Sequence, residues 1–486
     1  MGKTQHVKVA VIGAGHAGLN AIKEIRRHTD DYLLINGGPL GTTCARVGCM
    51  PSKALIEVSQ KLHTTRNIGH FVSRPEIEPF PNQEMIMETV RDLRDTFVDL
   101  VLANSTDEMP SDKLLDGYAQ FQDPKTLKVN GQSLTADRFI IATGTRPFIP
   151  DEFNAFRENI LTSDDLFELE SLPKSVAIIG LGSIGLEIGQ ALHRMGSEVV
   201  GLDHGDTLGG IQDPIIRDQA LQIFQREFPL HLGQKPKITK HEKGIRILVG
   251  DEEYIFEKLF LSVGRVPNLD RLGLECLGIA LNGQGIPEFD PATYQLRDLP
   301  IFIAGDVTGD RGTLQDAADG GRIAGFNAMR DMPLMFKRKT PMSIAFSDPN
   351  IACVGKSWSE LDMDRHVTGM ARLGPVGRAM IMRKNRGLIR VYAEKSSGQI
   401  VGGSMIGVRT EHLAHLLAWG IQQNMTAIEM LRMPFYHPVI EEGLQDALHH
   451  LVGNLEKPLN PMAQFESYEP TEIVRRPALC AEYSLI

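Results

Sequence analysis

The chain has 486 residues, of which 42% are hydrophobic and 23% are charged, and its formal net charge is −10. This composition predicts a soluble globular protein of about three domains. The negative charge argues against nucleic acid or an anionic membrane as the main partner, and no apolar run reaches the roughly 18 residues that span a bilayer. The N-terminus shows no apolar signal region and only five cysteines are present, so we expect a cytoplasmic protein.

A dinucleotide-binding unit is predicted at the start of the chain. Val7–Ile12 has the length and apolar character of a buried strand, and a helical pattern follows the loop after it. That loop has the form GxGxxG, with Gly13, Gly15 and Gly18, which permits a tight turn and close backbone approach to a pyrophosphate. The next strand ends at Asn36, where an acidic residue would normally grip a ribose, so we expect ribose binding in a weaker form there.

Two cysteines separated by four residues lie in the segment Gly41–Lys53. On a regular helix Cys44 and Cys49 would point about 140° apart. Gly48 and Pro51 weaken the turn, so a distorted helix could bring the sulfurs together as a reducible disulfide. The alternatives are half of a zinc site, a structural disulfide and two inert buried thiols. The other cysteines stand alone, which disfavours zinc, and a reducing compartment disfavours a structural disulfide.

Three further elements are predicted in the following hundred residues. Glu84–Leu102 has the pattern of a long amphipathic helix, and Gly117–Val129 that of a hairpin that turns at Asp123. Ile140–Gly144 is a strand that runs into a small-residue turn.

The glycine-rich unit then recurs. The strand Val176–Ile179 leads into Gly180, Gly182 and Gly185, and the next strand ends at Asp203. The first glycine and the strand end are 23 residues apart in both copies, which indicates two nucleotide sites. A carboxylate at Asp203 accepts hydrogen bonds from ribose hydroxyls and repels a 2′-phosphate. No arginine lies within several residues, so NAD is favoured over NADP.

The last part of the chain predicts a mixture of strands and helices. Ile301–Ile303 is a strand that ends in Gly305 and Asp306. Beyond about Pro341 the predicted strands are Ile351–Val354, Ala379–Met382, Gly387–Tyr392 and Gln399–Ile406, followed by helices at His412–Gln422 and Thr426–Leu431.

The segment Gly41–Lys53, in combination with these motifs, resembles the dimeric pyridine nucleotide–disulfide oxidoreductases, and most closely dihydrolipoamide dehydrogenase. The resemblance runs to about residue 460. It implies an α/β fold with two Rossmann-like domains, for FAD and NAD, and a C-terminal α+β dimerisation domain. The implied boundaries are 1–150 and 270–340 for the FAD domain, 151–269 for the NAD domain, 341–465 for dimerisation and 466–486 for a tail. Cys480 in that tail is expected to be an ordinary thiol.

The resemblance also assigns the chemistry of the thiol segment. Cys44 and Cys49 would form a redox-active disulfide, with Cys49 against the flavin and Cys44 exchanging with the substrate's sulfur. Lys53 would lie beside the flavin and pair with Glu187.

A second segment, Tyr436–Glu442, resembles the family's acid/base segment. It implies that His437, contributed across the interface of a homodimer, takes the proton of the substrate thiol. Glu442 would hold its other ring nitrogen.

The cofactor contacts implied by the resemblance form two sets, and no metal site is expected. Those for FAD are Gly13, Gly15, Gly18, Asn36, Thr43, Lys53, Ala119, Thr143, Gly144, Asp306 and Leu314, and those for NAD are Gly180, Gly182, Gly185, Asp203 and Gly264.

The expected reaction is oxidation of dihydrolipoamide, free or on a lipoyl domain, with reduction of NAD through FAD and the disulfide. Ser52 resembles lipoamide dehydrogenase or mercuric reductase more than glutathione reductase, and Cys480 lacks the companion that mercuric reductase needs. Three positions, Asn36, Asp316 and Phe435, depart from the lipoamide dehydrogenase pattern. The alternatives are reduction of another disulfide or of mercuric ion, pyridine nucleotide transhydrogenation, and a flavoprotein subunit or redox sensor without turnover.

Overall fold

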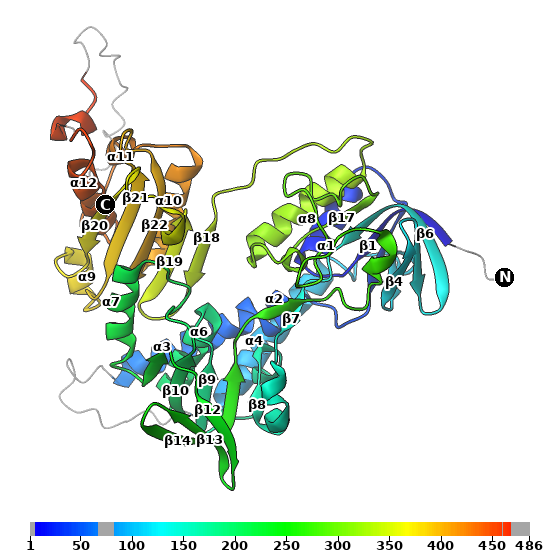
Figure 1. Ribbon diagram of the computed structural model, residues 1–486, viewed down its shortest axis with the longest axis horizontal. Helices are drawn as coiled ribbons and strands as arrows, with labels where there is room; N and C mark the ends of the chain where they lie inside the picture. The colour runs from blue at the N-terminus through cyan, green and yellow to red at the C-terminus, as the bar shows by residue number, and fades with distance from the viewer. Residues whose placement is uncertain (1–4, 67–81, 459, 468–486) are drawn as a thin grey trace, which may run out of the picture. The chain divides into compact units, whose positions relative to one another are not determined.

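The computed structural model describes residues 5–66, 82–458 and 460–467, which fall into two compact units (Figure 1). Unit 1 holds the chain up to residue 348, except residues 212–216 and 340–342. Unit 2 holds those two short segments together with the chain from residue 349 onward. Most of the predicted tail 466–486, with Cys480, lies outside the described residues, and the predicted domain boundaries stay predictions.

The first glycine-rich loop belongs to a seven-stranded sheet in unit 1. Its order is β3-β2-β1-β6-β5-β4, and β17 also pairs with β6. The strands are β1 (Gln5–Ile12), β2 (Tyr32–Asn36), β3 (Leu114–Asp116), β4 (Ala119–Asp123), β5 (Thr126–Val129), β6 (Gln132–Ile141) and β17 (Ile301–Ile303). β1 pairs in parallel with both β2 and β6, whereas β4 and β5 form the predicted antiparallel hairpin.

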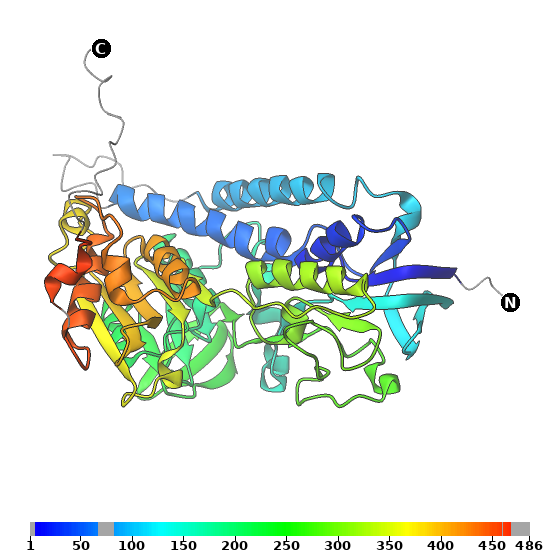
Figure 2. The same ribbon diagram turned by 90° about the horizontal axis from the view of Figure 1, so that it is seen from above.

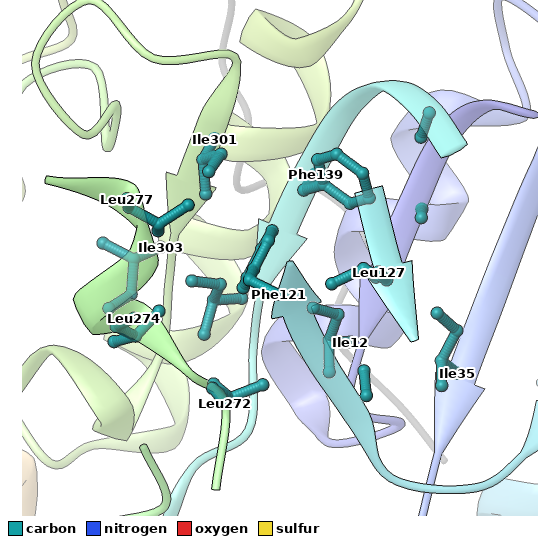
Figure 3. Packing of buried hydrophobic residues seen from close by; sticks show 14 of the residues in the cluster. Ile12, Ile35, Phe121, Leu127, Phe139, Leu272, Leu274, Leu277, Ile301 and Ile303 are labelled. Carbon is teal, nitrogen blue, oxygen red and sulfur yellow. The ribbon is translucent and has the colours of Figure 1, made fainter. Parts of the chain in front are cut away.

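Strand β1 is buried on both faces, as expected of a central parallel strand. Ala10 and Ile12 point into one hydrophobic cluster, and Val9 and Val11 point into the other. In the first cluster, drawn in Figure 3, the rings of Phe121 and Phe139 meet edge to face with centroids 5.3 Å apart. This packing fixes the carboxyl end of β1, from which the glycine-rich loop leaves the sheet.

Helices α1 (His16–Ile25) and α8 (Leu314–Ala328) pack against each other beside the second cluster. A Cβ added at Gly321 would lie 2.1 Å from the carbonyl oxygen of Ala17, so only glycine permits this approach. The next helices are α2 (Thr43–Val47), α3 (Cys49–Arg66) and α4 (Gln83–Ala103). α4 confirms the predicted amphipathic helix, and it lies beside α3 (Figure 2).

The second glycine-rich loop belongs to a parallel sheet of order β11-β10-β9-β15-β8. Its strands are β8 (Ile160–Leu161), β9 (Ser175–Ile179), β10 (Glu198–Asp203), β11 (Leu230–Leu232) and β15 (Lys258–Leu261), with helices α5 (Ser163–Leu166), α6 (Ser183–Arg194) and α7 (Pro214–Phe224). An antiparallel sheet of β12 (Lys237–His241), β13 (Gly244–Val249) and β14 (Glu252–Phe256) and a two-stranded sheet of β7 (Thr145–Pro147) and β16 (Arg265–Pro267) complete the region.

A five-stranded sheet, most of it in unit 2, has the order β18-β19-β22-β21-β20. Its strands are β18 (Met342–Ala345), β19 (Asn350–Gly355), β20 (His366–Arg372), β21 (Leu388–Glu394) and β22 (Ile400–Gly407). The helices are α9 (Gly377–Ile381), α10 (Thr410–Gln422), α11 (Ala427–Leu431) and α12 (Glu442–Gly453). With the mixed seven-stranded sheet and the parallel five-stranded sheet of unit 1, this arrangement confirms the predicted fold class.

The predicted strand Ala379–Met382 is wrong, because this segment lies in and just after helix α9. A short apolar run fits a strand and a helix equally well, and period alone does not separate them. Here Ala379 is buried, whereas Met380 and Ile381 are both exposed, so the run lacks the alternation of a strand. The edge strand in this region is instead β20, which the sequence prediction missed.

Candidate active site

The first glycine-rich loop joins β1 to α1 and is shaped by two close contacts. A Cβ at Gly13 would lie 2.4 Å from the carbonyl oxygen of Ala142, and φ there is +108°. A Cβ at Gly18 would lie 1.9 Å from the carbonyl oxygen of Gly13, so the helix starts directly against the strand end. Gly15 is the N-cap residue of α1 and its side-chain-free backbone leaves the first amides of the helix open toward an anion.

The side chain of Asn36 forms two hydrogen bonds, one of them to this loop. Its Oδ1 accepts a hydrogen bond from the amide of Ala14 at 3.0 Å, and its Nδ2 donates to the carbonyl oxygen of Gly38. The carbonyl oxygen of Asn36 accepts from the amide of Gly117 at 3.0 Å. Asn36 therefore fixes the loop conformation, and its expected weak contact with a ribose stays a prediction.

The second glycine-rich loop repeats this geometry around Asp203. Gly180 has φ +93°, and a Cβ at Gly185 would lie 1.9 Å from the Gly180 carbonyl oxygen. Asp203 Oδ2 accepts from the amide of Leu181 at 2.6 Å, which is the counterpart of the Asn36–Ala14 bond, and Oδ1 accepts from Gly205 at 2.8 Å.

A cleft of about 170 Å³ lies beside the second loop and is lined in part by Gly182, Ser183, Ile184, Gly264 and Arg265. Two of the predicted NAD contacts, Gly182 and Gly264, therefore line this cleft, and Gly180 lies against Ser262, another of its lining residues.

Three more of the predicted FAD contacts, Thr143, Gly144 and Asp306, follow the carboxyl ends of strands β6 and β17. Thr143 has a buried hydroxyl without a hydrogen-bond partner among the described residues, and its carbonyl oxygen accepts from Asn268. Gly144 has φ +64° and accepts from the amide of Asn268 at 3.0 Å. Asp306 is half-buried, and burial raises the pKa of its carboxyl group. A partnerless hydroxyl and a partly buried acid beside a glycine cradle fit a polar cofactor such as FAD.

Three other predicted contacts can offer less to a cofactor. Leu314 is the partly exposed first residue of α8, and Thr43 is the exposed first residue of α2. Ala119 is buried in the core at the start of β4, so it contributes packing and not a polar side chain.

The thiol pair lies where a short helix breaks and a long one begins. α2 ends at Gly48, whose φ is −123° and ψ is −121°, and α3 begins at Cys49. A Cβ at residue 48 would lie 2.9 Å from the carbonyl oxygen of Thr43 and 3.1 Å from Cα of Cys44, so glycine is required for the break. This distortion confirms the irregular turn expected from Gly48.

Cys44 and Cys49 are free thiols that hydrogen bond to each other through their side chains. The shared hydrogen bond and the positive charge of Lys53 lower the pKa of Cys49 to about 6, against the effect of burial. The same hydrogen bond, together with burial, raises the pKa of Cys44. Both cysteines are free thiols in the structure, and the oxidised disulfide stays a prediction.

An ion pair stands beside the thiolate. Lys53 Nζ lies 2.8 Å from Oε2 of the buried Glu187 on α6. Glu187 Oε1 accepts from the amide of Phe346 at 2.7 Å, and Lys53 Nζ lies 5.0 Å from the centroid of the Phe346 ring. The predicted pairing of Lys53 with Glu187 is present in the structure.

Sequence reasoning missed two further buried polar residues on the same face of α6. Gln190 exchanges hydrogen bonds with the backbone of Asp348. Arg194 forms ion pairs with Asp348 at 3.0 Å and with Glu227 at 2.8 Å. The spacing 187, 190, 194 is that of one helix face, which a buried amphipathic helix would have filled with apolar residues. Polar residues in an otherwise apolar helix face are the sequence signal that indicates this buried network.

The predicted acid/base pair lies in unit 2. His437 Nδ1 lies 2.8 Å from Glu442 Oε1, and Glu442 Oε2 accepts from the amide of Val439 at 3.1 Å. The bond to His437 and the Val439 amide lower the pKa of Glu442. The His437 ring is exposed, so its Nε2 is open to a reactant.

The departures Asp316 and Phe435 have different surroundings. Asp316 Oδ2 accepts from the hydroxyl of Thr313, and Oδ1 lies near both Arg311 and Arg338, at 3.5 and 3.3 Å. It therefore stabilises the start of α8. Phe435 is half-buried.

Two sheets, each with a glycine-rich loop between a pair of parallel strands, and a thiol pair backed by a lysine define a flavoprotein disulfide oxidoreductase. The sequence profile "Pyridine nucleotide-disulphide oxidoreductase" matches residues 7–321, and the dimerisation-domain profile of the same group matches residues 341–448. The chain therefore belongs to the pyridine nucleotide–disulphide oxidoreductase family, whose members use FAD and NAD(P).

The curated relatives carry more than one activity. A mercuric reductase of Acidithiobacillus ferrooxidans is 29% identical over 91% of this chain and 82% of its own length. Dihydrolipoyl dehydrogenase 2 of Haloarcula marismortui is 28% identical over 91% of this chain and 96% of its own length.

Solved structures with the same fold include the HOCl-induced flavoprotein disulfide reductase RclA from Escherichia coli, in a Cu(II) complex. It has a TM-score of 0.78 and 22% identity, and the match covers 92% of this chain and 99% of RclA. LpdA from Mycobacterium tuberculosis also has a TM-score of 0.78, with 23% identity over 91% of this chain and 99% of its own. In the part of the chain that the structure describes, no helix is both long and apolar enough to cross a membrane.

Proposed function

We propose that this protein is an NAD-linked FAD enzyme that oxidises a small dithiol, with dihydrolipoamide or a protein-bound lipoyl group as the favoured substrate. The observation that carries the proposal is the thiol pair at the break between α2 and α3, with Lys53 one turn after Cys49 on α3 and held there by Glu187. The charge of Lys53 lowers the pKa of Cys49. In thiol–disulfide exchange the sulfur with the lower pKa is the better leaving group. Cys49 is therefore the leaving thiolate, and Cys44 is the sulfur that the substrate attacks.

The electrons of the exchange balance, because the Cys44–Cys49 disulfide is the oxidant of the substrate dithiol. A substrate thiolate attacks Cys44 of the Cys44–Cys49 disulfide, the S–S bond breaks, and Cys49 leaves as a thiolate. The second substrate thiol, deprotonated, attacks the substrate sulfur on Cys44, which releases the cyclic disulfide product and leaves the two cysteines reduced. Bound FAD would accept the electron pair from these thiols and pass it to NAD.

The residues of this chain supply the proton handling. His437 is the base for the substrate thiol, because its Nε2 is open while its Nδ1 is held by Glu442. Lys53 keeps Cys49 ionised after each turnover. Asp203, whose Oδ2 accepts from the second loop at Leu181, places a carboxylate at the ribose end of the site and supports NAD over NADP.

The proposed enzyme works as a cytoplasmic homodimer with a shared active site. The match to the dimerisation domain supports this, and helices α9 and α10 and the loop after α11 expose large apolar side chains: Met380, Ile381, Trp419 and Met433. Exposed apolar residues of this size commonly mark a protein interface. His437 would then serve the thiols of the partner chain.

Dihydrolipoamide is favoured over mercuric ion because the sequence has no second cysteine near Cys480. The second candidate is reduction of a different disulfide, which the ion pairs of Asp316 and the apolar Phe435 favour, since lipoamide dehydrogenases usually carry histidine at both positions.

The deciding experiment compares lipoamide, glutathione disulfide and mercuric ion as acceptors of electrons from NADH in one preparation. Turnover of lipoamide, abolished in Cys44→Ser, is expected. No turnover of lipoamide would contradict the favoured substrate. Activity that survives Cys44→Ser would indicate transhydrogenation between nicotinamides, and bound flavin that no disulfide reoxidises would indicate a sensor.

A further inference from the structure

The loop that follows β10 folds back onto the second glycine-rich loop. The amide of Leu181 donates to Asp203 at 2.6 Å, and the amide of Gly209 donates to the carbonyl oxygen of Leu181 at 2.7 Å. Residues 203–209 therefore lie against the loop that would receive the pyrophosphate. In this fold the end of that strand faces the adenosine ribose, where an acid selects the free 2′-hydroxyl and an arginine accepts a 2′-phosphate.

The structure brings one arginine to this loop from a distance in sequence. Arg217, on α7, has Nη1 2.7 Å from Oδ2 of Asp206. Its Nη2 and Nε also lie 3.1 and 3.2 Å from Oδ1 of Asp218. The guanidinium is thus held by two carboxylates, and one of them, Asp206, lies three residues beyond the ribose-selecting Asp203. The side chain of Asp206 is 77% exposed and that of Arg217 is 26% exposed.

We propose that Asp206 is a second determinant of nicotinamide specificity, which acts by holding Arg217 away from a 2′-phosphate. The proposal rests on the proposed NAD site and extends it. An arginine binds a phosphate through two parallel hydrogen bonds, whereas a surface ion pair between side chains is weak. By this comparison alone, Arg217 would leave Asp206 and bind a phosphate. It does not do so because the negative charges of Asp203 and Asp206 both repel the incoming phosphate dianion.

Removal of Asp206 has two consequences that act in the same direction. One negative charge leaves the ribose end of the site, and the guanidinium of Arg217 keeps only its adjacent partner Asp218. Affinity for a 2′-phosphorylated nucleotide should rise, whereas NADH, which has no phosphate there, should be little affected. Removal of Arg217 should cancel the gain.

The test is direct anaerobic titration of the FAD-loaded protein, fully reduced beforehand so that it cannot accept hydride, with NADPH and NADH, followed by nicotinamide fluorescence. The variants are Asp206→Ser, Asp203→Ser, the double variant Asp203→Ser/Asp206→Ser, and that double variant with Arg217→Gln. Glu253→Gln is the matched control, since Arg246 and Glu253 form a similar exposed ion pair at 2.6 Å in the antiparallel sheet β12–β14.

We expect the double variant to bind NADPH about tenfold more tightly than Asp203→Ser, with NADH binding within about twofold, and Arg217→Gln to remove that gain. Asp206→Ser alone should tighten NADPH binding about threefold over Glu253→Gln. This single exposed substitution gives an answer even if loss of Asp203 disturbs the loop.

Two results would overturn the proposal: an unchanged NADPH affinity in Asp206→Ser, or a gain in the double variant that persists without Arg217. A wild-type protein that prefers NADPH over NADH would instead contradict the proposed NAD-linked function. The two failures are therefore distinguishable.

Discussion

Lys53 Nζ and Glu187 Oε2 lie 2.8 Å apart, so an ion pair joins α3 to α6 across 134 residues of sequence. The carboxylate cannot turn freely, because its other oxygen accepts from the amide of Phe346. The cation is therefore fixed beside Cys49 and lowers the pKa of that thiol. The reactivity of the thiol pair therefore depends on α3, α6 and the segment at Phe346, which are distant from one another in the sequence.

Replacement of Lys53 by Met should raise the pKa of Cys49 above about 6. The thiolate forms as pH rises through the pKa. The midpoint of the pH dependence of the Cys49 alkylation rate should therefore move to higher pH in the reduced protein. Cys44→Ala should raise it further, because the hydrogen bond from Cys44 is the largest cause of the lowered value. The measurement is the rate of iodoacetamide alkylation between pH 4 and pH 10. Lys61→Met, on the same helix, is the control, and equal profiles for Lys53→Met and wild type would exclude the electrostatic role.

Replacement of Glu442 by Gln should reduce kcat at neutral pH by roughly tenfold, and His437→Ala should reduce it by about a hundredfold or more. The Glu442 pKa is lowered by its bonds to His437 and Val439, so the carboxylate form that orients His437 is kept as pH falls below the usual carboxyl range. The measurement is the pH profile of kcat with lipoamide and NADH. His412→Ala, which removes an exposed histidine next to Glu411, should leave activity near wild type.

A mixture of His437→Ala chains and Cys44→Ser chains should regain activity after unfolding and refolding together. If each site takes its thiols from one chain and its histidine from the other, half of the dimers are mixed and each has one complete site. Recovery should then approach about a quarter of wild-type activity. Recovery no greater than the sum of the separately refolded variants would show that each site lies within one chain.

Gly48→Ala should destabilise the protein by about 1–3 kcal/mol, because the new methyl group would press on the backbone of Thr43 and Cys44. Gly283→Ala is the matched control, since a Cβ there meets no atom within 4 Å. Urea unfolding of both variants gives the two free energies of unfolding. Equal stability of the two would mean that the helix break tolerates a side chain.

Arg194→Met should destabilise the protein by about 3 kcal/mol, because it leaves Glu227 and Asp348 without their shared cation in a largely buried position. Arg322→Met removes an exposed arginine paired with Asp319 and should change the free energy of unfolding by less than about 1 kcal/mol. If both variants unfold at the same urea concentration, the buried network does not hold this segment.

The parts of the fold that repeat a local pattern could be predicted from the sequence. Both glycine-rich loops, the helix α4 and the β4–β5 hairpin depend on residues close together in the chain, so period and turn residues were sufficient. The helix α9 was misassigned because four apolar residues carry no decisive period. Sequence pattern also could not reveal that Asp348 pairs with Arg194, since that contact depends on how remote segments meet.

The candidate site likewise has a part that could be predicted from neighbouring residues and a part that depends on the fold. Cys44, Cys49 and Gly48 form one local unit, and its distorted geometry followed from the residue types. Arg217 lies well beyond Asp203 in the sequence, so proximity along the chain does not point to it, and only the fold brings it to Asp206.

The third glycine of each loop, Gly18 and Gly185, touches the carbonyl oxygen of the first glycine of its own loop, and any side chain would collide with it at 1.9 Å. These two positions are therefore demanded by the chain itself, whether or not a nucleotide ever arrives. A descendant that had lost one cofactor would therefore still keep the first and third glycines of that loop, whereas a Cβ at Gly182 meets no atom within 4 Å. In proteins with this fold, the residue at the end of the second strand, Asn36 or Asp203 here, therefore shows more clearly than the glycines whether a cofactor site has been kept or lost.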